Sequence, residues 1–357
     1  MKIAFVYDWF DKVGGAERIL KVLHEMYPDA PWYTSYRDEQ RASWAQGWDV
    51  RTSFIQKLPR FVRGHRLLTL PLLPLAFESF DFSSYDVVVS ITSSFAKHII
   101  TKPTTRHICY LLTPTRWLWH DDYGHTGTLH KMTREYFKRL DLIASTRVDE
   151  YLTISQEVQK RCKMVYGRES EVVYPPFDEA YWHQLASEKN TNSQSTKYHL
   201  VVSRLEPYKR VDLVIDAWKS RKDRLVIIGT GSQEYQLRAQ ANGMSIEFYA
   251  HLTDAELATW YAGAQALIMP QVEDFGYTAL EAQACGCPVV AYDRGGARET
   301  VYYGVLFEEQ TPVSLSRALV KCANLQYNPD TYENRHIRGG SRNTFVATFS
   351  QKISETV

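Results

Sequence analysis

Residues 264–292, AQALIMPQVEDFGYTALEAQACGCPVVAY, contain the pattern that decides the fold of this chain. The apolar run AQALIMP is typical of a buried strand, the segment after Gly276 of a short helix, and CPVVAY of a second buried strand. This succession predicts parallel strands joined by a crossover helix. Glu273 follows the first strand and Glu281 lies in the helix, yet acidic side chains are rarely buried without a partner. The two carboxylates therefore need either a ligand or a structural partner.

The alternation of strand and helix continues on both sides of this segment. KIAFVY (2–7) precedes a glycine turn and a helical pattern, and YHLVVSR (198–204) opens a second series after a polar, aperiodic stretch at 188–197. We therefore predict an α/β fold with two doubly wound domains that bind ligands at the carboxyl ends of their strands. The predicted boundaries are 1–180 for the first domain, 181–198 for a linker, 199–335 for the second domain and 336–357 for a final helix.

The composition limits the class of protein. A chain of 357 residues is long enough for two cores, and 42 Lys and Arg against 41 Asp and Glu leave no global field to attract nucleic acid. No apolar run approaches the roughly 18 residues that span a membrane, and the first residues are not those of a signal peptide. The cysteines form an odd set without a Cys-x-x-Cys pair, which favours a reduced, cytoplasmic setting and argues against a zinc site. They are Cys109, Cys162, Cys285, Cys287 and Cys322.

The helix within the opening segment offers a candidate site at its first turn. Free N–H groups and the helix dipole favour an anion near Phe275–Thr278, and carboxylates accept hydrogen bonds from vicinal hydroxyls. A phosphate at the helix start, with hydroxyl binders at Glu273 and Glu281, describes a pocket for a nucleotide sugar. In the structural alternative, Glu273 caps the helix and Glu281 pairs with a surface arginine such as Arg294 or Arg298. These residues alone leave both interpretations open.

Two cations follow another predicted strand. In VVSRLEPYKRVD (201–212), Arg204 ends the strand and Lys209 lies just before or inside the next helix. An arginine fork and a mobile lysine that converge on a diphosphate stabilise it as a leaving group. The plainer interpretation is that both side chains are solvated surface charges.

Glycine turns follow two of the predicted strands. Gly14 and Gly15 lack the G-x-G-x-x-G spacing of a nicotinamide site, so a dehydrogenase is not supported. They either permit close approach of a phosphate or hydroxyl to the backbone or form a plain tight turn. GTGS (229–232) either borders a ligand or is only a loop.

Two stretches of the second half resemble the retaining family-four glycosyltransferases, which have the GT-B fold. They are SRLEPYKRVDLVIDA (203–217) and TDAELATWYAGAQALIMPQVEDFGYTALEAQACGCPVVAYDRGGARETV (253–301). The resemblance extends over nearly the whole chain and is strongest from 199 to 307. It implies two Rossmann-like domains facing a central cleft, an acceptor-side domain and then a nucleotide-sugar donor domain, with the last helix crossing back to the first. A nucleotide sugar is then a substrate, and since no Asp-x-Asp occurs, no metal or other cofactor is expected.

The resemblance also implies roles for individual residues. Arg204 and Lys209 match the cations that hold the donor diphosphate, and Glu273 matches the residue that contacts hydroxyls of the transferred sugar. Glu281 matches the ribose-binding residue, and Gly15 matches a glycine loop near the donor phosphates and the acceptor. The backbone beside the sugar is that of Phe275, Gly276, Tyr277 and Thr278.

The sequence of residues 274–301 is most similar to a bacterial branch of this family that acts in O-antigen and capsule assembly, and many members of that branch use GDP-mannose. That branch carries a His before its Thr-Pro or Ser-Pro pair, where this chain has Leu112. We assign no catalytic His; Thr113, backbone carbonyls or His120 could do part of that work. The expected enzyme moves a hexose onto a lipid-linked or oligosaccharide acceptor. The departure at Leu112 keeps a non-catalytic nucleotide-sugar or glycan-binding homologue as the alternative.

Segment 54–77 places basic residues beside a leucine-rich run. Such a surface suits docking on the anionic inner face of a membrane, where a lipid-linked acceptor lies, and core packing of the leucines is the alternative. Both interpretations stay open and both leave the chain in the cytoplasm. The adjacent acids of HDDYGH (120–125) are more typical of a solvated loop than of a metal site. The basic residues of the segment are Lys57, Arg60, Arg63 and Arg66.

Overall fold

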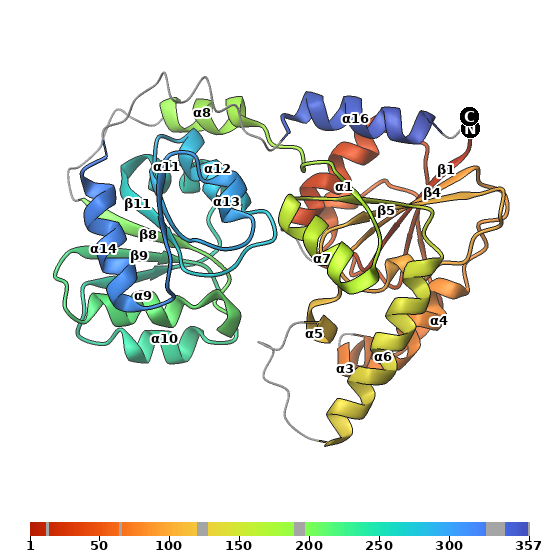
Figure 1. Cartoon of the computed structure of the whole chain (residues 1–357), viewed down its shortest axis with the longest axis horizontal. Helices are drawn as coiled ribbons and strands as arrows, with labels where there is room; N and C mark the ends of the chain where they lie inside the picture. The colour runs from red at the N-terminus through yellow and green to blue at the C-terminus, as the bar shows by residue number, and fades with distance from the viewer. Residues whose placement is uncertain (12–13, 64–65, 120–127, 189–196, 326–339, 356–357) are drawn as a thin grey trace. The chain divides into compact units, whose positions relative to one another are not determined.

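The structure is a computed structural model that describes residues 1–11, 14–63, 66–119, 128–188, 197–325 and 340–355. The chain divides into two compact units (Figure 1). Unit 1 comprises Met1–Pro176 and Arg342–Val357, and unit 2 comprises Phe177–Ser341. His120, the HDDYGH segment and most of the aperiodic stretch at 188–197 lie outside the described residues.

Unit 1 is built on a parallel sheet of seven strands in the order β3-β2-β1-β4-β5-β6-β7. The chain runs from β1 to β2 and β3 on one side and from β4 to β7 on the other. The topology therefore reverses between β1 and β4, and the carboxyl ends of these two strands flank the usual ligand position of such a sheet. The strands are β1 (Ile3–Tyr7), β2 (Trp32–Thr34), β3 (Val50–Thr52), β4 (Val87–Thr92), β5 (Arg106–Leu111), β6 (Glu150–Thr153) and β7 (Glu171–Val172).

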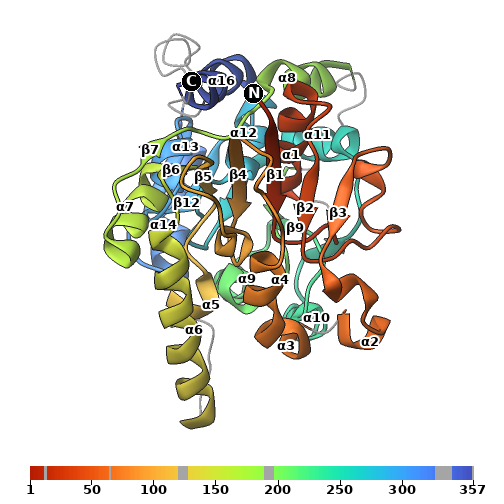
Figure 2. The same ribbon diagram turned by 90° about the vertical axis from the view of Figure 1, so that its right-hand side faces the viewer.

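The helices of unit 1 cover this sheet with apolar faces. In α1, Ile19, Leu20 and Leu23 recur at helical spacing and are buried. Figure 2 shows α2, α3, α4 and α6 together at one end of the unit, where α4 and α6 share a core around Phe77 and Phe137. The helices are α1 (Gly15–Met26), α2 (Arg60–Arg63), α3 (Arg66–Thr69), α4 (Leu73–Glu78), α5 (Arg116–Trp119), α6 (Thr128–Thr146) and α7 (Gln156–Tyr166), with short 3₁₀ turns at Ser43–Ala45, Phe54–Lys57, Leu70–Leu72 and Ala96–His98.

The last helix, α16 (Arg342–Ser354), belongs to unit 1. Phe345 and Phe349 are buried, and their rings lie 6.0 and 5.6 Å from the ring of Tyr110 on β5. Arg342 pairs with Glu25 of α1, and both views show α16 beside α1 (Figures 1 and 2). The return of the last helix to the first domain is therefore present, and its apolar side chains explain it.

Unit 2 is built on a parallel sheet of six strands in the order β10-β9-β8-β11-β12-β13. Its topology reverses between β8 and β11, so the carboxyl ends of these two strands flank its ligand position. The strands are β8 (Tyr198–Val202), β9 (Arg224–Ile228), β10 (Ile246–Tyr249), β11 (Ala264–Met269), β12 (Val289–Tyr292) and β13 (Gly304–Phe307). The helices are α8 (Glu179–Glu188), α9 (Val211–Trp218), α10 (Glu234–Gln240), α11 (Asp254–Gly263), α12 (Tyr277–Ala284), α13 (Ala297–Thr300) and α14 (Pro312–Ala323), with a 3₁₀ turn, η7, at Pro207–Lys209.

Thus two doubly wound parallel sheets are present, as the sequence predicts. The linker differs from the expectation of 181–198, because residues up to Glu188 form α8 and the division between the units falls after Pro176. Trp182 explains the difference: its side chain is 2% exposed and its ring lies 5.9 Å from that of Tyr261 on α11. One buried tryptophan thus fixes to unit 2 a helix whose other residues are mostly polar.

Candidate functional site

The loop after β8 carries the two predicted cations and is held by glycines of the next loop. Ser203 N donates to Ile228 O at 3.0 Å and Leu205 N to Thr230 O at 2.9 Å, so the backbone pairing continues beyond the strand. A Cβ at Gly229 would lie 1.8 Å from Ser203 O, and one at Gly231 would lie 2.3 Å from Leu205 O. The GTGS turn is therefore a close backbone contact that supports this loop.

The two cations of this loop have different surroundings. Arg204 is exposed, and its guanidinium donates to the Tyr208 hydroxyl at 2.5 Å. Lys209 ends η7 and is buried, with 7% of its surface exposed. The Tyr208 ring contacts both cations, since Arg204 Cζ and Lys209 Nζ lie 5.7 and 5.6 Å from the centroid of this ring. Sequence analysis missed Tyr208, although it lies between the two cations in the sequence.

The loop after β11 presents Glu273 and is fixed by the two glycines that follow β12. Gly296 N donates to Glu273 O at 2.7 Å, and the backbone of Gly295 forms a parallel bridge with Glu273. Gly295 has a left-handed φ of 69°, and a Cβ there would lie 2.3 Å from Glu273 O. The Thr300 hydroxyl donates to Phe275 O at 3.3 Å. The RGG sequence at 294–296 was the available signal for this support, and it was not used.

Lys209 and Glu273 form an ion pair where the two loops meet. Lys209 Nζ lies 2.5 Å from Glu273 Oε1, and the side chains are 9% and 16% exposed. Gln271 Nε2 donates to the same oxygen at 2.7 Å. Because β8 and β11 flank the reversal of the sheet, the pair lies at the edge where such folds bind ligands. The structure thus brings two of the predicted site residues into contact and rules out Lys209 as a solvated surface charge.

The start of α12 has the predicted form. Gly276 is the N-cap residue, with φ of 104°, and a Cβ at this position would lie 3.2 Å from Thr300 Oγ1. Phe275 is buried against Tyr277, with ring centroids 5.2 Å apart, and Thr278 donates to the sulfur of Met269. The N-cap residue of α12 is therefore Gly276 and not Glu273. The N–H groups in the first turn of a helix favour an anion, and in α12 they belong to the residues that follow Gly276.

Glu281 lies one turn further and is 4% exposed. Its Oε2 accepts a hydrogen bond from the Tyr261 hydroxyl of α11 at 3.0 Å. Burial, and then the charge of Glu281, raise the pKa of the Cys285 thiol to about 12. The proposed surface pairing is wrong, because Arg298 pairs instead with Asp293 at 2.7 Å and Glu281 is internal. A carboxylate buried in this way needs the tyrosine hydroxyl as a partner.

In unit 1 the reversal of the sheet is marked by Asp8, which sequence analysis did not select. It is 1% exposed and accepts hydrogen bonds from Thr92 Oγ1 and from the N–H groups of Phe95 and Ala96, each at 2.8 Å. This carboxylate ties the end of β1 to the loop after β4. Gly15, at the start of α1, is exposed and follows the same strand.

The segment after β5 contains Leu112 at the position where a His was expected. Leu112 is 8% exposed and Thr113 is 2% exposed, so both are largely internal. A fully buried pair, Lys97 Nζ and Asp141 Oδ1 at 2.5 Å, contacts Thr115, two residues after Thr113. Burial alone would raise the pKa of Asp141, and the Lys97 ammonium instead holds that pKa well below its usual range. Trp119 Nε1 donates to Asp141 Oδ2 at 2.7 Å, so this carboxylate fixes the end of α5.

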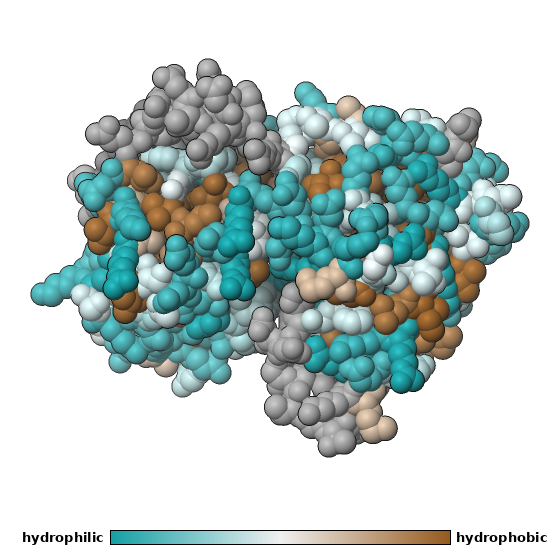
Figure 3. Space-filling model, in the orientation of Figure 1, coloured by the Kyte–Doolittle hydropathy of each residue, from teal (hydrophilic) through white to brown (hydrophobic). Residues whose placement is uncertain are grey.

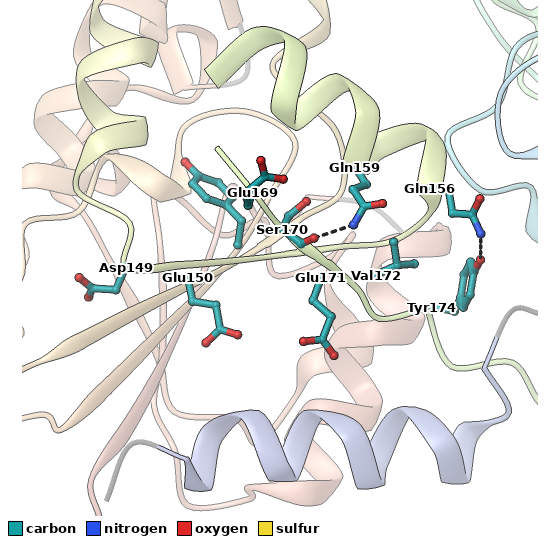
Figure 4. A pocket seen from close by; sticks show the side chains of 10 residues that line it. Asp149, Glu150, Gln156, Gln159, Glu169, Ser170, Glu171, Val172 and Tyr174 are labelled. Atoms are coloured by element: carbon teal, nitrogen blue, oxygen red, sulfur yellow. Dashed lines mark hydrogen bonds between the residues drawn. The ribbon is translucent and has the colours of Figure 1, made fainter. Parts of the chain in front are cut away.

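A hollow of about 610 Å³ lies beside the edge strand β7 of unit 1 (Figure 4). Its lining includes Glu150, Glu169 and Glu171, and Lys352 of α16 pairs with Glu171 at 2.7 Å. Gln159 Nε2 donates to Ser170 O at 2.6 Å across it. The hollow runs from Asp149 and Glu150 at the amino end of β6 to Gln156 and Tyr174 beyond the carboxyl ends of β6 and β7, and we assign it no function. Within the described part of the chain no group of three or more His, Cys, Asp or Glu is arranged to hold a metal ion.

Comparison with known proteins finds a family match in the second half of the chain. Residues 184–336 match the family described as glycosyl transferases group 1. The match covers less than half of the chain. The ion pair of Lys209 and Glu273 and the start of α12 lie within the matched segment.

Individual relatives agree with this match. Over 202 residues the chain is 30% identical to a GDP-mannose-dependent monoacylated alpha-(1-6)-phosphatidylinositol monomannoside mannosyltransferase of Corynebacterium glutamicum. This match covers 49% of this chain and 53% of the relative. The chain spans about half the length of the curated relatives it matches, or less.

Solved structures establish the fold of the whole chain. The Anabaena protein HepE, solved in complex with UDP, has a TM-score of 0.68 and 19% identity, with 100% of this chain and 99% of that chain covered. HepE has also been solved in complex with UDP-glucose. A sucrose-phosphate synthase of Thermosynechococcus elongatus has a TM-score of 0.74 and 15% identity, with 99% of each chain covered. The fold is the two-domain GT-B type.

Proposed function

We propose that this chain is a retaining glycosyltransferase that moves a hexose from a nucleoside diphosphate sugar to a hydroxyl of a glycan or lipid-linked acceptor in surface polysaccharide synthesis. The observation that carries the proposal is the contact between Lys209 and Glu273 at the reversal of the unit 2 sheet. A cation and a carboxylate at one ligand edge suit a ligand that has both a diphosphate and a sugar.

In the proposed reaction the bond between the sugar C1 and the diphosphate oxygen breaks, and the electron pair leaves with the diphosphate. The acceptor oxygen bonds to C1 on the same face, and its proton passes to the departing phosphate. Lys209 and Arg204 balance the charge that develops on the diphosphate, which is electrostatic stabilisation of the transition state. Glu273 receives hydroxyls of the transferred sugar, Glu281 receives the ribose hydroxyls, and no metal or other cofactor takes part.

The donor we propose is GDP-mannose. The named substrate of the mannosyltransferase of Corynebacterium glutamicum supports this choice, whereas the UDP and UDP-glucose complexes of HepE support a uridine nucleotide as the competing donor. The N–H groups from Phe275 to Thr278 suit the diphosphate of either. They do not discriminate between the two bases.

We further propose that the chain acts in the cytoplasm and docks on an anionic membrane through segment 54–77. Phe61, Leu68 and Leu75 are 75%, 52% and 57% exposed, whereas Leu73 and Phe77 are buried in the core. Both interpretations therefore hold for part of the segment, because some of its apolar side chains pack in the core and others face outward beside Arg60 and Arg63. Figure 3 shows apolar surface in the part of unit 1 that holds α4 and α6. Among the helices of the described residues, none has both the length and the hydropathy that a membrane span requires.

The second candidate is a non-catalytic nucleotide-sugar or glycan-binding homologue, which Leu112 favours because this residue cannot exchange a proton. A thermal-shift screen against GDP-, UDP- and TDP-sugars tests binding, since a ligand of the native state raises the unfolding midpoint. Release of nucleoside diphosphate from the best ligand, with and without an acceptor glycan, then separates the two candidates. Binding without release of nucleoside diphosphate under either condition supports the second candidate and refutes the first.

A further inference from the structure

Gln271 follows β11 by one residue and is 2% exposed. Its Nε2 donates to Glu273 Oε1 at 2.7 Å. Its Oε1 is also buried, and within the described chain that oxygen receives no hydrogen bond. The amide is therefore half satisfied, which is unusual for a buried polar side chain.

The orientation of this amide follows from the chemistry of its neighbour. An ionised carboxylate only accepts hydrogen bonds, so the NH₂ group must face Glu273 and the amide oxygen must point elsewhere. Reversing the amide would oppose two oxygens and would remove the hydrogen bond. The side chain thus gains one charge-assisted hydrogen bond and leaves one acceptor unpaired.

A second buried glutamine of the same unit shows what a purely structural amide looks like. Gln283 on α12 is fully buried, and its Nε2 donates to Ala279 O at 2.7 Å and to Thr300 O at 2.9 Å. Its Oε1 accepts from Tyr302 N at 2.8 Å and from Tyr303 N at 2.7 Å. Every polar atom of Gln283 holds backbone in place, whereas the one protein contact that is known for the amide of Gln271 is the Glu273 carboxylate.

We propose that Gln271 is a positioning residue that holds the Glu273 carboxylate for the sugar part of the donor, an inference that rests on the proposed function. Lys209 and Gln271 donate to the same oxygen of Glu273 from the segments that follow the two strands flanking the sheet reversal. A bound diphosphate draws the Lys209 ammonium towards its own oxygens and weakens the hold of Lys209 on Glu273. Gln271 carries no charge and is not drawn away, so it keeps the carboxylate oriented in the liganded state.

The test compares Gln271→Met, which has a similar size and no donor, with Gln283→Met as the matched control. Titration calorimetry measures the binding of UDP, GDP, UDP-glucose and GDP-mannose to the full chain. For the nucleotide sugar that the wild type binds, we expect Gln271→Met to raise the Kd by about tenfold or more, because one hydrogen bond to a charged group contributes on that scale. The Kd of the corresponding nucleoside diphosphate stays within about twofold of the wild-type value. Gln283→Met leaves the ratio of these two dissociation constants unchanged.

Thermal unfolding distinguishes positioning from a structural role. Gln271→Met removes an unpaired buried oxygen, so its unfolding midpoint stays level with the wild type or rises, whereas the midpoint of Gln283→Met falls by several degrees. A lower midpoint for Gln271→Met with both affinities unchanged overturns the proposal. So does an equal loss of affinity for the nucleoside diphosphate and its sugar.

A second variant keeps the proposal testable if Gln271→Met fails to fold. Gln271→Glu has the same shape, and its ionised carboxylate cannot donate to Glu273. Burial and the Glu273 carboxylate raise the pKa of such a carboxyl, the Lys209 ammonium opposes this rise, and a proton restores the donor as the pH falls. The nucleotide-sugar affinity of Gln271→Glu relative to the wild type therefore rises between pH 8 and pH 5.5 in our expectation, and a flat ratio overturns the proposal. If the wild type binds none of the four ligands, the proposed function fails and this inference fails with it.

Discussion

The ion pair of Lys209 and Glu273 leads to a prediction that distinguishes its effect on the stability of the protein from its effect on ligand binding. Lys209→Met removes the cation and leaves a carboxylate that is 16% exposed and holds the hydrogen bond from Gln271. Removing one partner of a buried pair costs about 3–5 kcal/mol, and the remaining exposure and hydrogen bond reduce this to about 2–3 kcal/mol. For a unit of this size, 1 kcal/mol corresponds to roughly 2–4 °C, so the unfolding midpoint falls by about 5–10 °C.

The double variant Lys209→Met with Glu273→Gln is the control for this prediction. It removes the uncompensated charge as well as the cation, so the midpoint returns to within about 2 °C of the wild type. Neither variant binds the donor, because the diphosphate has lost its buried cation in both. The assay is differential scanning fluorimetry with and without the best nucleotide sugar of the screen. If the double variant unfolds at the same temperature as Lys209→Met or at a lower one, the unpaired carboxylate did not destabilise the protein, and the reasoning then fails.

Three further predictions address other parts of the chain. Gly295→Ala places a Cβ 2.3 Å from Glu273 O, so it lowers the unfolding midpoint and abolishes donor binding in the fluorimetry screen. Burial lowers the pKa of His107 to about 3, whereas the pKa of a His in the unfolded chain is about 6.5. The contribution of neutral His107 to the free energy of unfolding is therefore fully present above about pH 6.5 and is lost as the pH decreases towards 3. Between pH 7.5 and 5.0 this group removes about 2 kcal/mol, and urea unfolding of His107→Gln shows a smaller decrease. Phe61→Ser lowers sedimentation with phosphatidylglycerol vesicles severalfold, whereas the equally exposed Met164→Ser on α7 does not change it; equal sedimentation of both variants contradicts docking through 54–77.

The fold could be predicted because its signal is local. Apolar runs such as IAFVY, VVVSIT and AQALIM alternate with helical patterns, and only a parallel sheet covered by helices buries both faces of such strands. The boundary at 181–198 could not be predicted in the same way. The buried side chain of Trp182 packs α8 onto unit 2, and the rest of that helix has too little apolar periodicity to be told from a linker.

The site was predictable to the extent that it depends on strand ends. Lys209 and Glu273 were selected because each follows a strand, and the sheet order brings those two ends together. Gln271, Tyr208 and Tyr261 were not selected, because an amide or a phenol is assigned a role only when its partner is known. That partner depends on loop geometry, which no periodicity encodes.

The contact of Lys209 with Glu273 depends on residues that have no side chains. Cβ atoms at Gly229 and Gly231 would lie 1.8 and 2.3 Å from the backbone of the loop that carries Lys209. Cβ atoms at Gly295 and Gly296 would lie 2.3 and 2.4 Å from the backbone of the loop that carries Glu273. At each of these four positions a larger residue must push a loop away from its neighbour. A shift of about 1 Å in either loop stretches a hydrogen bond of normal length beyond its useful range, so the glycines hold the cation and the carboxylate in register for a diphosphate and its sugar.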